Sequence, residues 1–318
     1  MPDSSSTAVH VDPTPTATDG ERGLASCGEV HLAYERIGDR EDPAVLLVMG
    51  LGSQLVLWPD ALCQALVDAG YQVIRFDNRD VGLSTKLDGV MAPNIPALVV
   101  KQRLGLPTTV PYRISTMAED AVALMDALQI DQAHVIGASM GGMITQVMAA
   151  MQPRRVLSAA LIMTTTGHPR GKQPSFSLQR RLVRKRPRAL DEAITQSVAT
   201  YRLIGSTGFE QTDAEIRAKV ERQINRNVCP GGTLRQLSAI IGSPHRAQLV
   251  RQIKQPCLVL HGKADPLVPV EAAHDLKAKI PHARLDVIDG WGHDFPNALV
   301  PRIADTLVRH LGDASQHL

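Results

Sequence analysis

Aromatic residues are scarce in this chain of 318 residues, and neither sign of charge dominates it. Phe, Trp and Tyr together make up 3% of the sequence, which argues against the base-stacking platforms of single-stranded nucleic-acid binders. The net charge is +2, from 34 Lys and Arg against 32 Asp and Glu, whereas contacts to phosphates need a clear cationic excess. We therefore expect no nucleic-acid partner.

Cysteine is also rare, and the few cysteines form no C-x-x-C pair. A zinc ribbon, a redox pair and a disulfide-stapled fold are therefore not predicted. The 11 histidines show no H-E-x-x-H or similar spacing, so we expect no metal ion and no cofactor. Buried free thiols are predicted at all four cysteines, Cys27, Cys63, Cys229 and Cys257.

Long apolar runs are missing as well. No stretch approaches the 18 or so consecutive apolar residues that a membrane span needs, and no secretory signal is visible, which predicts a cytoplasmic protein. Residues 1–22 are rich in Ser, Thr, Pro and Asp and cannot bury enough apolar surface to offset their ordering entropy, so they predict a flexible tail. The sequence does not determine the oligomeric state, and a homo-oligomer is compatible with it.

Short apolar runs alternate with helical patterns through most of the remaining chain. This alternation predicts βαβ units and an α/β fold with a mostly parallel, eight-stranded-type sheet and helices on both of its faces. The strand-like runs are 29–36, 44–49, 71–76, 133–136, 156–163, 256–261 and 283–288, and the helical runs of the core are 58–69, 116–128, 140–151, 270–280 and 296–311.

One long helical stretch interrupts the alternation. It predicts a helical cap over residues 166–249, inserted into a core made of residues 23–165 and 250–318. A basic run at 180–188 is interpreted as a solvated face of the cap, and attraction to anionic lipid or to an acidic substrate is the alternative. Residues 93–107 form an apolar excursion that either lines the entrance or packs on the cap.

The strongest motif is G-x-S-x-G, centred on Ser139 between a strand-like run and a helical run. A residue at such a tight turn takes strained backbone angles, and Gly137 and Gly141 remove the Cβ atoms that would collide there. The strain lifts the Ser139 hydroxyl clear of the sheet, and the helix N-terminus offers free N–H groups. Ser139 is therefore a candidate nucleophile; the alternative is a glycine-rich helix start that contains a serine by chance.

A serine nucleophile needs a base, and the base needs an acid that orients it. Asp265 follows one late strand-like run and His293 follows the next. Because parallel strands end at the same edge of a sheet, we expect Ser139, Asp265 and His293 to lie together. Alternatives are a helix-capping role for Asp265 and a surface position for His293, and Asp289 and Asp294 are competing acids.

Negative charge that develops on a carbonyl oxygen needs two N–H groups aimed at it, an oxyanion hole. The backbone N–H of Met140 follows the candidate nucleophile directly. The backbone N–H of Leu51 lies in a loop where Gly50 and Gly52 allow close approach to a substrate. We predict that Leu51 and Met140 form the hole; an ordinary glycine turn is the alternative for the Leu51 loop.

Taken together, these motifs resemble the α/β-hydrolase fold superfamily over residues 25–312. Residues 48–54 (VMGLGSQ), 77–84 (DNRDVGLS) and 141–146 (GGMITQ) are further similar to actinobacterial capped esterases of the lipase type and to polyketide methylesterases. The resemblance implies a carboxylic ester hydrolase, of the EC 3.1.1 type, that forms an acyl-enzyme on Ser139. Its substrate is expected to be a small-molecule ester with a hydrophobic acyl group.

Two positions depart from the family pattern. Met49 stands where the oxyanion loop usually has histidine, and Asp80 stands where glycine is common. Asp77 and Arg79 are interpreted as a structural ion pair, buried or half-buried, that holds their loop; a direct role in substrate binding is the alternative. The same fold and triad also serve carbon–carbon bond hydrolases, thioesterases and perhydrolases, so these reactions stay open, as does a non-catalytic ligand receptor.

Overall fold

A computed structural model of the chain describes residues 20–168, 171–182, 187 and 189–316. The predicted tail over residues 1–22 lies outside this range except for its last residues. Glu21 and Arg22 are not part of a tail, because they begin the first strand of the sheet.

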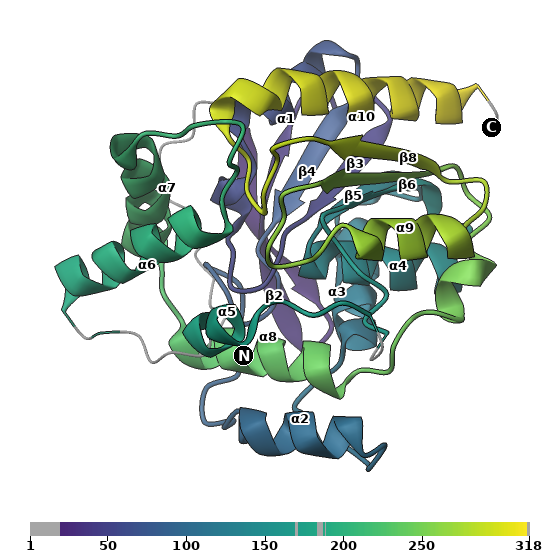
Figure 1. Cartoon of the computed structure of the whole chain (residues 1–318). Coiled ribbons are helices and arrows are strands. Elements are labelled where there is room, and N and C mark those ends of the chain that lie inside the picture. Colours follow the sequence, from purple (N-terminus) through teal and green to yellow (C-terminus); the bar gives the residue numbers. More distant parts are fainter. Residues whose placement is uncertain (1–19, 169–170, 183–186, 188, 317–318) are drawn as a thin grey trace, which may run out of the picture.

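One eight-stranded sheet forms the centre of the molecule (Figure 1). Its strands follow the order β1-β2-β4-β3-β5-β6-β7-β8. The two pairs at one end, β1 with β2 and β2 with β4, are antiparallel, and all other neighbours are parallel. The predicted α/β class is confirmed. The strands are β1 (Glu21–Cys27), β2 (Val30–Ile37), β3 (Ala44–Val48), β4 (Gln72–Phe76), β5 (Ala133–Ala138), β6 (Val156–Ile162), β7 (Cys257–Gly262) and β8 (Arg284–Ile288).

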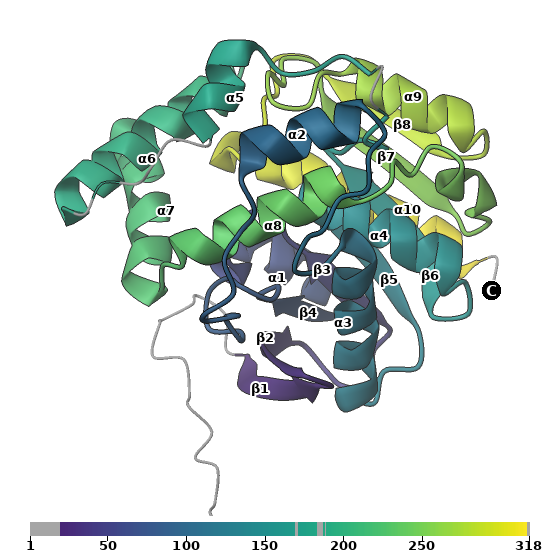
Figure 2. The ribbon, with the colours of Figure 1, turned by 90° about the horizontal axis from the view of Figure 1, so that it is seen from below.

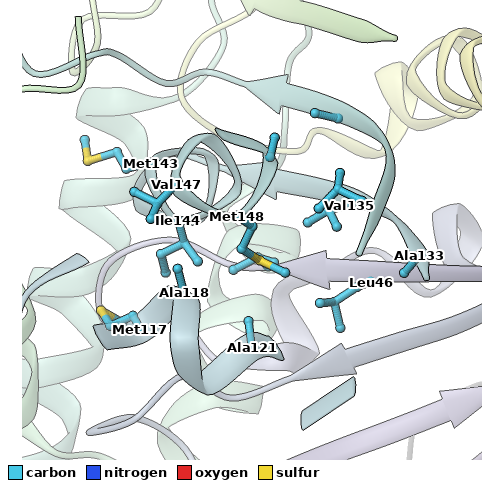
Figure 3. Close-up of a cluster of buried hydrophobic side chains, with 14 of the residues drawn as sticks. Leu46, Met117, Ala118, Ala121, Ala133, Val135, Met143, Ile144, Val147 and Met148 are labelled. Carbon is cyan, nitrogen blue, oxygen red and sulfur yellow. The ribbon is translucent and has the colours of Figure 1, made fainter. Parts of the chain in front are cut away.

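Helices cover both faces of the sheet, which explains why the central strands are continuous apolar runs rather than alternating ones. All residues of β3, β4 and β5 are buried. Figure 3 shows part of one apolar layer, to which one helix contributes Met117 and Ala121, another contributes Ile144 and Met148, and the sheet contributes Val135. The covering helices are α3 (Ile114–Ala127), α4 (Met140–Met151) and α9 (Glu271–Lys279) on this face and α1 (Asp60–Asp68) and α10 (Val300–Ser315) on the other.

The carboxyl ends of the parallel strands meet at one edge of the sheet. Val48 of β3 pairs with Gly137 of β5, and Ala138 of β5 pairs with Ile162 of β6. At the far side, Gly262 of β7 pairs with Ile288 of β8. Loops that follow these strands therefore project from the same edge, which is where open α/β sheets place their ligands.

A group of helices between β6 and β7 lies over this edge. The 3₁₀ turn at Leu249–Gln252 that follows them packs on α4, so Leu249, which the predicted cap includes, contacts the core. One capping box starts α7, where the Thr212 hydroxyl accepts from the backbone N–H of Glu215. The helices are α5 (Phe176–Leu182), α6 (Leu190–Ile204), α7 (Asp213–Arg226) and α8 (Pro230–Gly242).

Two elements were not predicted from the sequence. Strand β1 was missed because its residues alternate only weakly between apolar and polar. Helix α2 (Ile95–Arg103) occupies the apolar excursion, and Asn94 caps it by accepting from the backbone N–H of Ala97. Figure 2 shows α2 beside α8, so the excursion contacts the inserted helices, and it also lines the cavity described below.

The basic run at 180–188 is only partly described. Arg180 and Arg181 lie in the last turn of α5, and residues 183–186 and 188 fall outside the described range. In the described ranges, none of the helices combines the length and apolar character that crossing a bilayer requires.

Candidate active site

Ser139 sits at the sharp turn between β5 and α4. Its backbone angles are φ 56° and ψ −118°, a region that residues with a side chain rarely adopt. A Cβ at Gly137 would overlap the carbonyl of Gly141, and a Cβ at Gly141 would overlap the carbonyl of Val48 on β3. Both glycines are therefore required sterically, and the turn directs the Ser139 side chain into the space above the sheet edge.

The structure brings Ser139, Asp265 and His293 together. The His293 Nε2 atom lies 3.0 Å from the Ser139 Oγ atom, and the His293 Nδ1 atom lies 2.6 Å from the Asp265 Oδ2 atom. A carboxylate only accepts hydrogen bonds, so Nδ1 carries the proton and Nε2 is free to accept from the Ser139 hydroxyl. The Asp265 side chain is fully buried, and its Oδ1 atom accepts from the backbone N–H groups of Leu267 and Val268.

The two competing acids are engaged elsewhere. Asp294 accepts hydrogen bonds from Ser206 and Gln211, and burial raises the pKa of its carboxyl. Asp289 pairs with Lys263 at the surface. Neither carboxylate is bonded to the imidazole of His293.

The end of α6 and the residues that follow it support the loop that carries His293. The backbone N–H of His293 donates to the Ile204 carbonyl at 2.7 Å, and the Gly292 N–H donates to the Ser206 hydroxyl at 3.0 Å. A Cβ at Gly292 would overlap the backbone of Gly205. The loop is therefore packed directly against the inserted helices, and its glycine permits that close approach.

The loop after β3 passes directly over Ser139. An ideal Cβ at Gly50 would lie 3.1 Å from the Ser139 Cβ atom, so even an alanine there would crowd the serine. The next residue, Leu51, lines the cavity, and Met140 is the first residue of α4. Within the described part of the chain, no protein acceptor takes up the N–H of Leu51 or Met140; free N–H groups are normal in the first turn of a helix.

Two side chains that the sequence reasoning missed hold this loop in place. Gln236 of α8 is fully buried, accepts from the Gly52 N–H at 2.8 Å and donates to the Arg79 carbonyl at 2.7 Å. Asn78 donates to the Met49 carbonyl at 3.0 Å. These bonds connect segments that are far apart in the chain, and no local motif signals them.

Asp77 and Arg79 do not form the predicted ion pair with each other. Asp77 pairs with Arg226 of α7 in a fully buried contact, and its carboxylate also accepts from the Leu55 N–H at 2.7 Å. Arg79 forms a two-pronged pair with Asp120 of α3, at 2.5 and 2.6 Å. The two side chains bind partners on opposite sides of their loop, because the loop lies between the inserted helices and the core.

Asp80, the second departure from the family pattern, has φ 71°, the left-handed region that favours glycine. Its buried carboxylate binds Arg235 of α8 and accepts from the Tyr112 hydroxyl at 2.7 Å. Burial alone would raise the pKa of Asp80, but hydrogen bonds from Arg235, the Leu87 N–H and Tyr112 hold it below its usual value. The buried carboxylate is thus fully satisfied by partners from α8 and from the loop before α3.

A cavity of about 2000 Å³ opens above Ser139 and His293. Its walls come from the sheet edge, from α2 and from the inserted helices, and most of them are apolar, as in small-molecule sites generally. Among the described residues, no group of three His, Cys, Asp or Glu side chains could hold a metal ion.

Three of the four thiols that were predicted to be buried are buried. They are Cys27, Cys63 and Cys257, and burial raises their pKa to about 12, 11 and 12. The fourth, Cys229, lines the cavity and is only partly buried.

The family model for the alpha/beta hydrolase fold matches residues 43–296 of the chain. Among curated proteins, the chain is similar to the rhodomycin D methylesterase DauP of Streptomyces sp. (strain C5), with 28% identity over 89% of this chain and 95% of that protein. It is also similar to the 3-oxoadipate enol-lactonase 2 of Acinetobacter baylyi, with 29% identity over 82% of this chain and 86% of that protein.

Solved structures show the same fold. The meta-cleavage product hydrolase of Pseudomonas fluorescens IP01 superposes with a TM-score of 0.72 and 19% identity, covering 92% of this chain and 97% of that one. The enol-lactonase of Burkholderia xenovorans LB400 gives a TM-score of 0.70 and 22% identity, covering 91% and 99%.

Proposed function

The chain belongs to the alpha/beta hydrolase fold family, and from that premise we propose that it cleaves carboxylic esters through an acyl-enzyme on Ser139. The observation that carries the proposal is the continuous hydrogen-bonded line from Asp265 through His293 to Ser139 at the floor of the cavity. The methylesterase and enol-lactonase relatives, whose names both describe action on esters, support the ester class.

In the proposed mechanism, His293 Nε2 accepts the Ser139 proton while Ser139 Oγ attacks the ester carbonyl carbon. The backbone N–H groups of Leu51 and Met140 hold the oxyanion that forms. Asp265 keeps the imidazole in the required tautomer and stabilises its cation. His293 then protonates the leaving alcohol as the ester C–O bond breaks. In the second half it takes a proton from the water that attacks the acyl-enzyme, and it returns that proton to Ser139 Oγ as the acyl–oxygen bond breaks and the acid is released.

Replacement of the nucleophile tests this proposal. Ser139→Ala is expected to lower kcat for p-nitrophenyl esters by about 10⁴-fold or more, because nucleophile, base and acid act as one unit. A fluorophosphonate probe should label the wild-type protein once and should not label the variant. Ester hydrolysis at a wild-type rate by a folded Ser139→Ala protein would overturn the assignment, and a folded wild-type protein that resists labelling would favour a non-catalytic receptor.

Substrate panels separate the alternatives that share the triad. We expect simple esters to be hydrolysed with higher kcat/KM than thioesters or carbon–carbon bond substrates such as β-diketones. A reversed order would keep the triad and reassign the reaction.

A further inference from the structure

Arg246 is a buried cation that lines the same cavity as Ser139. It lies between α8 and β7 and is 5% exposed. Its Nε atom donates to the Gln146 side chain at 3.2 Å, and its Nη2 atom donates to the Thr165 carbonyl at 3.3 Å. Both acceptors are neutral, so neither compensates the positive charge.

No described carboxylate forms an ion pair with Arg246. The internal positions outside the described range, 169–170, 183–186 and 188, contain no Asp or Glu in the sequence. Burial lowers the pKa of Arg246 to about 10, so the guanidinium is still protonated at neutral pH. A buried charge without a partner is costly, and proteins normally pair such a charge or use it to bind something.

The carboxylates that line the cavity already have partners. They cannot neutralise Arg246 without breaking other bonds. Four further lining cations have no carboxylate partner among the described residues, but none of them is buried as Arg246 is: Arg103 and Arg180 are exposed and Arg181 and Lys219 are partly exposed, so solvent screens them. The partnered carboxylates are Asp60 with Arg75 and Arg222, Glu271 with Lys172, Asp275 with Lys279, and Asp294 with Ser206 and Gln211.

Two parts of the structure, residues 164–165 and helix α4, connect Arg246 to the neighbourhood of Ser139. The Thr164 hydroxyl donates to the Ser139 carbonyl at 2.7 Å, and the next residue, Thr165, accepts from Arg246. On α4, Gln146 lies seven residues after Ser139, which places it roughly 10 Å farther along the helix axis. One small molecule can therefore reach both Ser139 and Arg246.

We propose that Arg246 binds a carboxylate of the substrate, so that the esters this chain prefers carry a second, acidic group. The proposal rests on the proposed function, because it places that acid in the cavity from which the ester reaches Ser139. The guanidinium suits the role because its planar donors match the two oxygens of a carboxylate. The Nη1 donors, which have no described protein acceptor, are available for this bond.

Matched substrates test the wild-type protein first. One series compares mono-p-nitrophenyl esters of linear dicarboxylic acids with p-nitrophenyl esters of monocarboxylic acids of the same length. A second compares acyl esters of 4-hydroxybenzoate with acyl esters of phenol, which moves the charge to the alcohol side. We expect kcat/KM to be about 30-fold higher for the acidic ester at the best length in one series. Equal or lower values for acidic esters throughout both series would overturn the proposal.

Substitution then assigns the preference to Arg246. Arg246→Met should lower the ratio of acidic-ester to neutral-ester kcat/KM by about 30-fold, mainly through KM, and Arg246→Lys should keep part of the ratio because it keeps the charge. Arg222→Met is the matched control, since Arg222 lines the same cavity but already pairs with Asp60. An unchanged ratio in Arg246→Met, or an equal loss in Arg222→Met, would contradict the assignment.

Direct binding separates this proposal from the proposed function. Calorimetric titration of the Ser139→Ala protein with an acidic ester of the preferred series, either a monomethyl dicarboxylate of the best length or the matching acyl ester of 4-hydroxybenzoate, should give an affinity that the added substitution Arg246→Met removes. If no ester of any kind is hydrolysed, the proposed function fails, whether or not this binding occurs. If neutral esters are hydrolysed through Ser139 but the acidic ester of the preferred series does not bind, only the role of Arg246 fails.

Discussion

The sheet core is held together chiefly by apolar packing, with a buried ion pair between Arg75 of β4 and Glu35 of β2, whereas the junction between core and inserted helices depends on buried ion pairs. In the core, two layers of buried apolar side chains pack against the faces of the sheet. At the junction, buried ion pairs join Asp77 to Arg226 of α7 and Asp80 to Arg235 of α8. Apolar burial is non-directional and tolerates repacking, whereas a buried ion pair is directional and fails when one partner is lost. The helices above the site are therefore attached at defined points.

Loss of one partner at the junction is expected to have the largest effect on stability. Arg226→Met leaves the fully buried carboxylate of Asp77 without its cation and should lower the free energy of unfolding by about 4 kcal/mol. Urea denaturation at pH 7 measures this. The double variant Arg226→Met/Asp77→Asn should recover part of the loss, because it removes the uncompensated charge. A loss below about 1 kcal/mol for the single variant would show that the junction does not depend on this pair.

Acid should weaken the core before it weakens the junction. Burial lowers the pKa of His134 and of His310 to about 4, and neighbouring Arg284 contributes for His310. A histidine whose pKa is lowered in the folded protein makes its full contribution to stability above about pH 6.5, the pKa that it has in the unfolded chain. That contribution is lost as the pH falls toward 4. Lowering the pH from 6.5 to 5 should therefore lower the free energy of unfolding by about 2 kcal/mol for each histidine. The ion pair of Asp80 should persist there, because the pKa of Asp80 is held low.

Urea denaturation at pH 6.5 and pH 5 of the wild-type protein and of His134→Gln measures this difference. The variant removes one titrating group and should therefore lose about 2 kcal/mol less than the wild type on acidification. The same acid sensitivity in both proteins would assign the effect to other groups.

The same division between core and junction describes what the sequence could predict. Strands and helices of the core follow local periodicity, so α4 was predicted with its observed bounds, and the glycines around Ser139 indicated the turn. The order of loops after parallel strands was enough to place Asp265 and His293 near Ser139. The predicted ion pair between Asp77 and Arg79 was wrong, and the contact of Gln236 with the loop after β3 was not predicted. The observed contacts join segments that are 41 to 184 residues apart. Such contacts depend on how the helices pack, which no short motif encodes.

Gln236 tests whether the junction also positions the oxyanion loop. Gln236→Leu removes the bonds to the Gly52 N–H and the Arg79 carbonyl and should lower kcat for p-nitrophenyl esters by about 10- to 100-fold with little change in KM. Gln179→Leu is the control, because Gln179 lines the cavity and, among the described residues, its side chain bonds to the nearby Pro174 carbonyl alone. A rise in KM at constant kcat would instead assign Gln236 to substrate binding.

An exposed ion pair across the same junction should have the smallest effect. Lys172 of the inserted segment pairs with Glu271 of α9 at 2.7 Å, and the two side chains are 63% and 51% exposed. Solvent and salt screen such a pair, and holding two long side chains in place costs entropy, so Lys172→Met should change the free energy of unfolding by less than about 1 kcal/mol. Urea denaturation at low and high salt measures this. If Lys172→Met lowered the free energy of unfolding as much as Arg226→Met does, burial would not explain why some ion pairs of the junction stabilise the protein more than others.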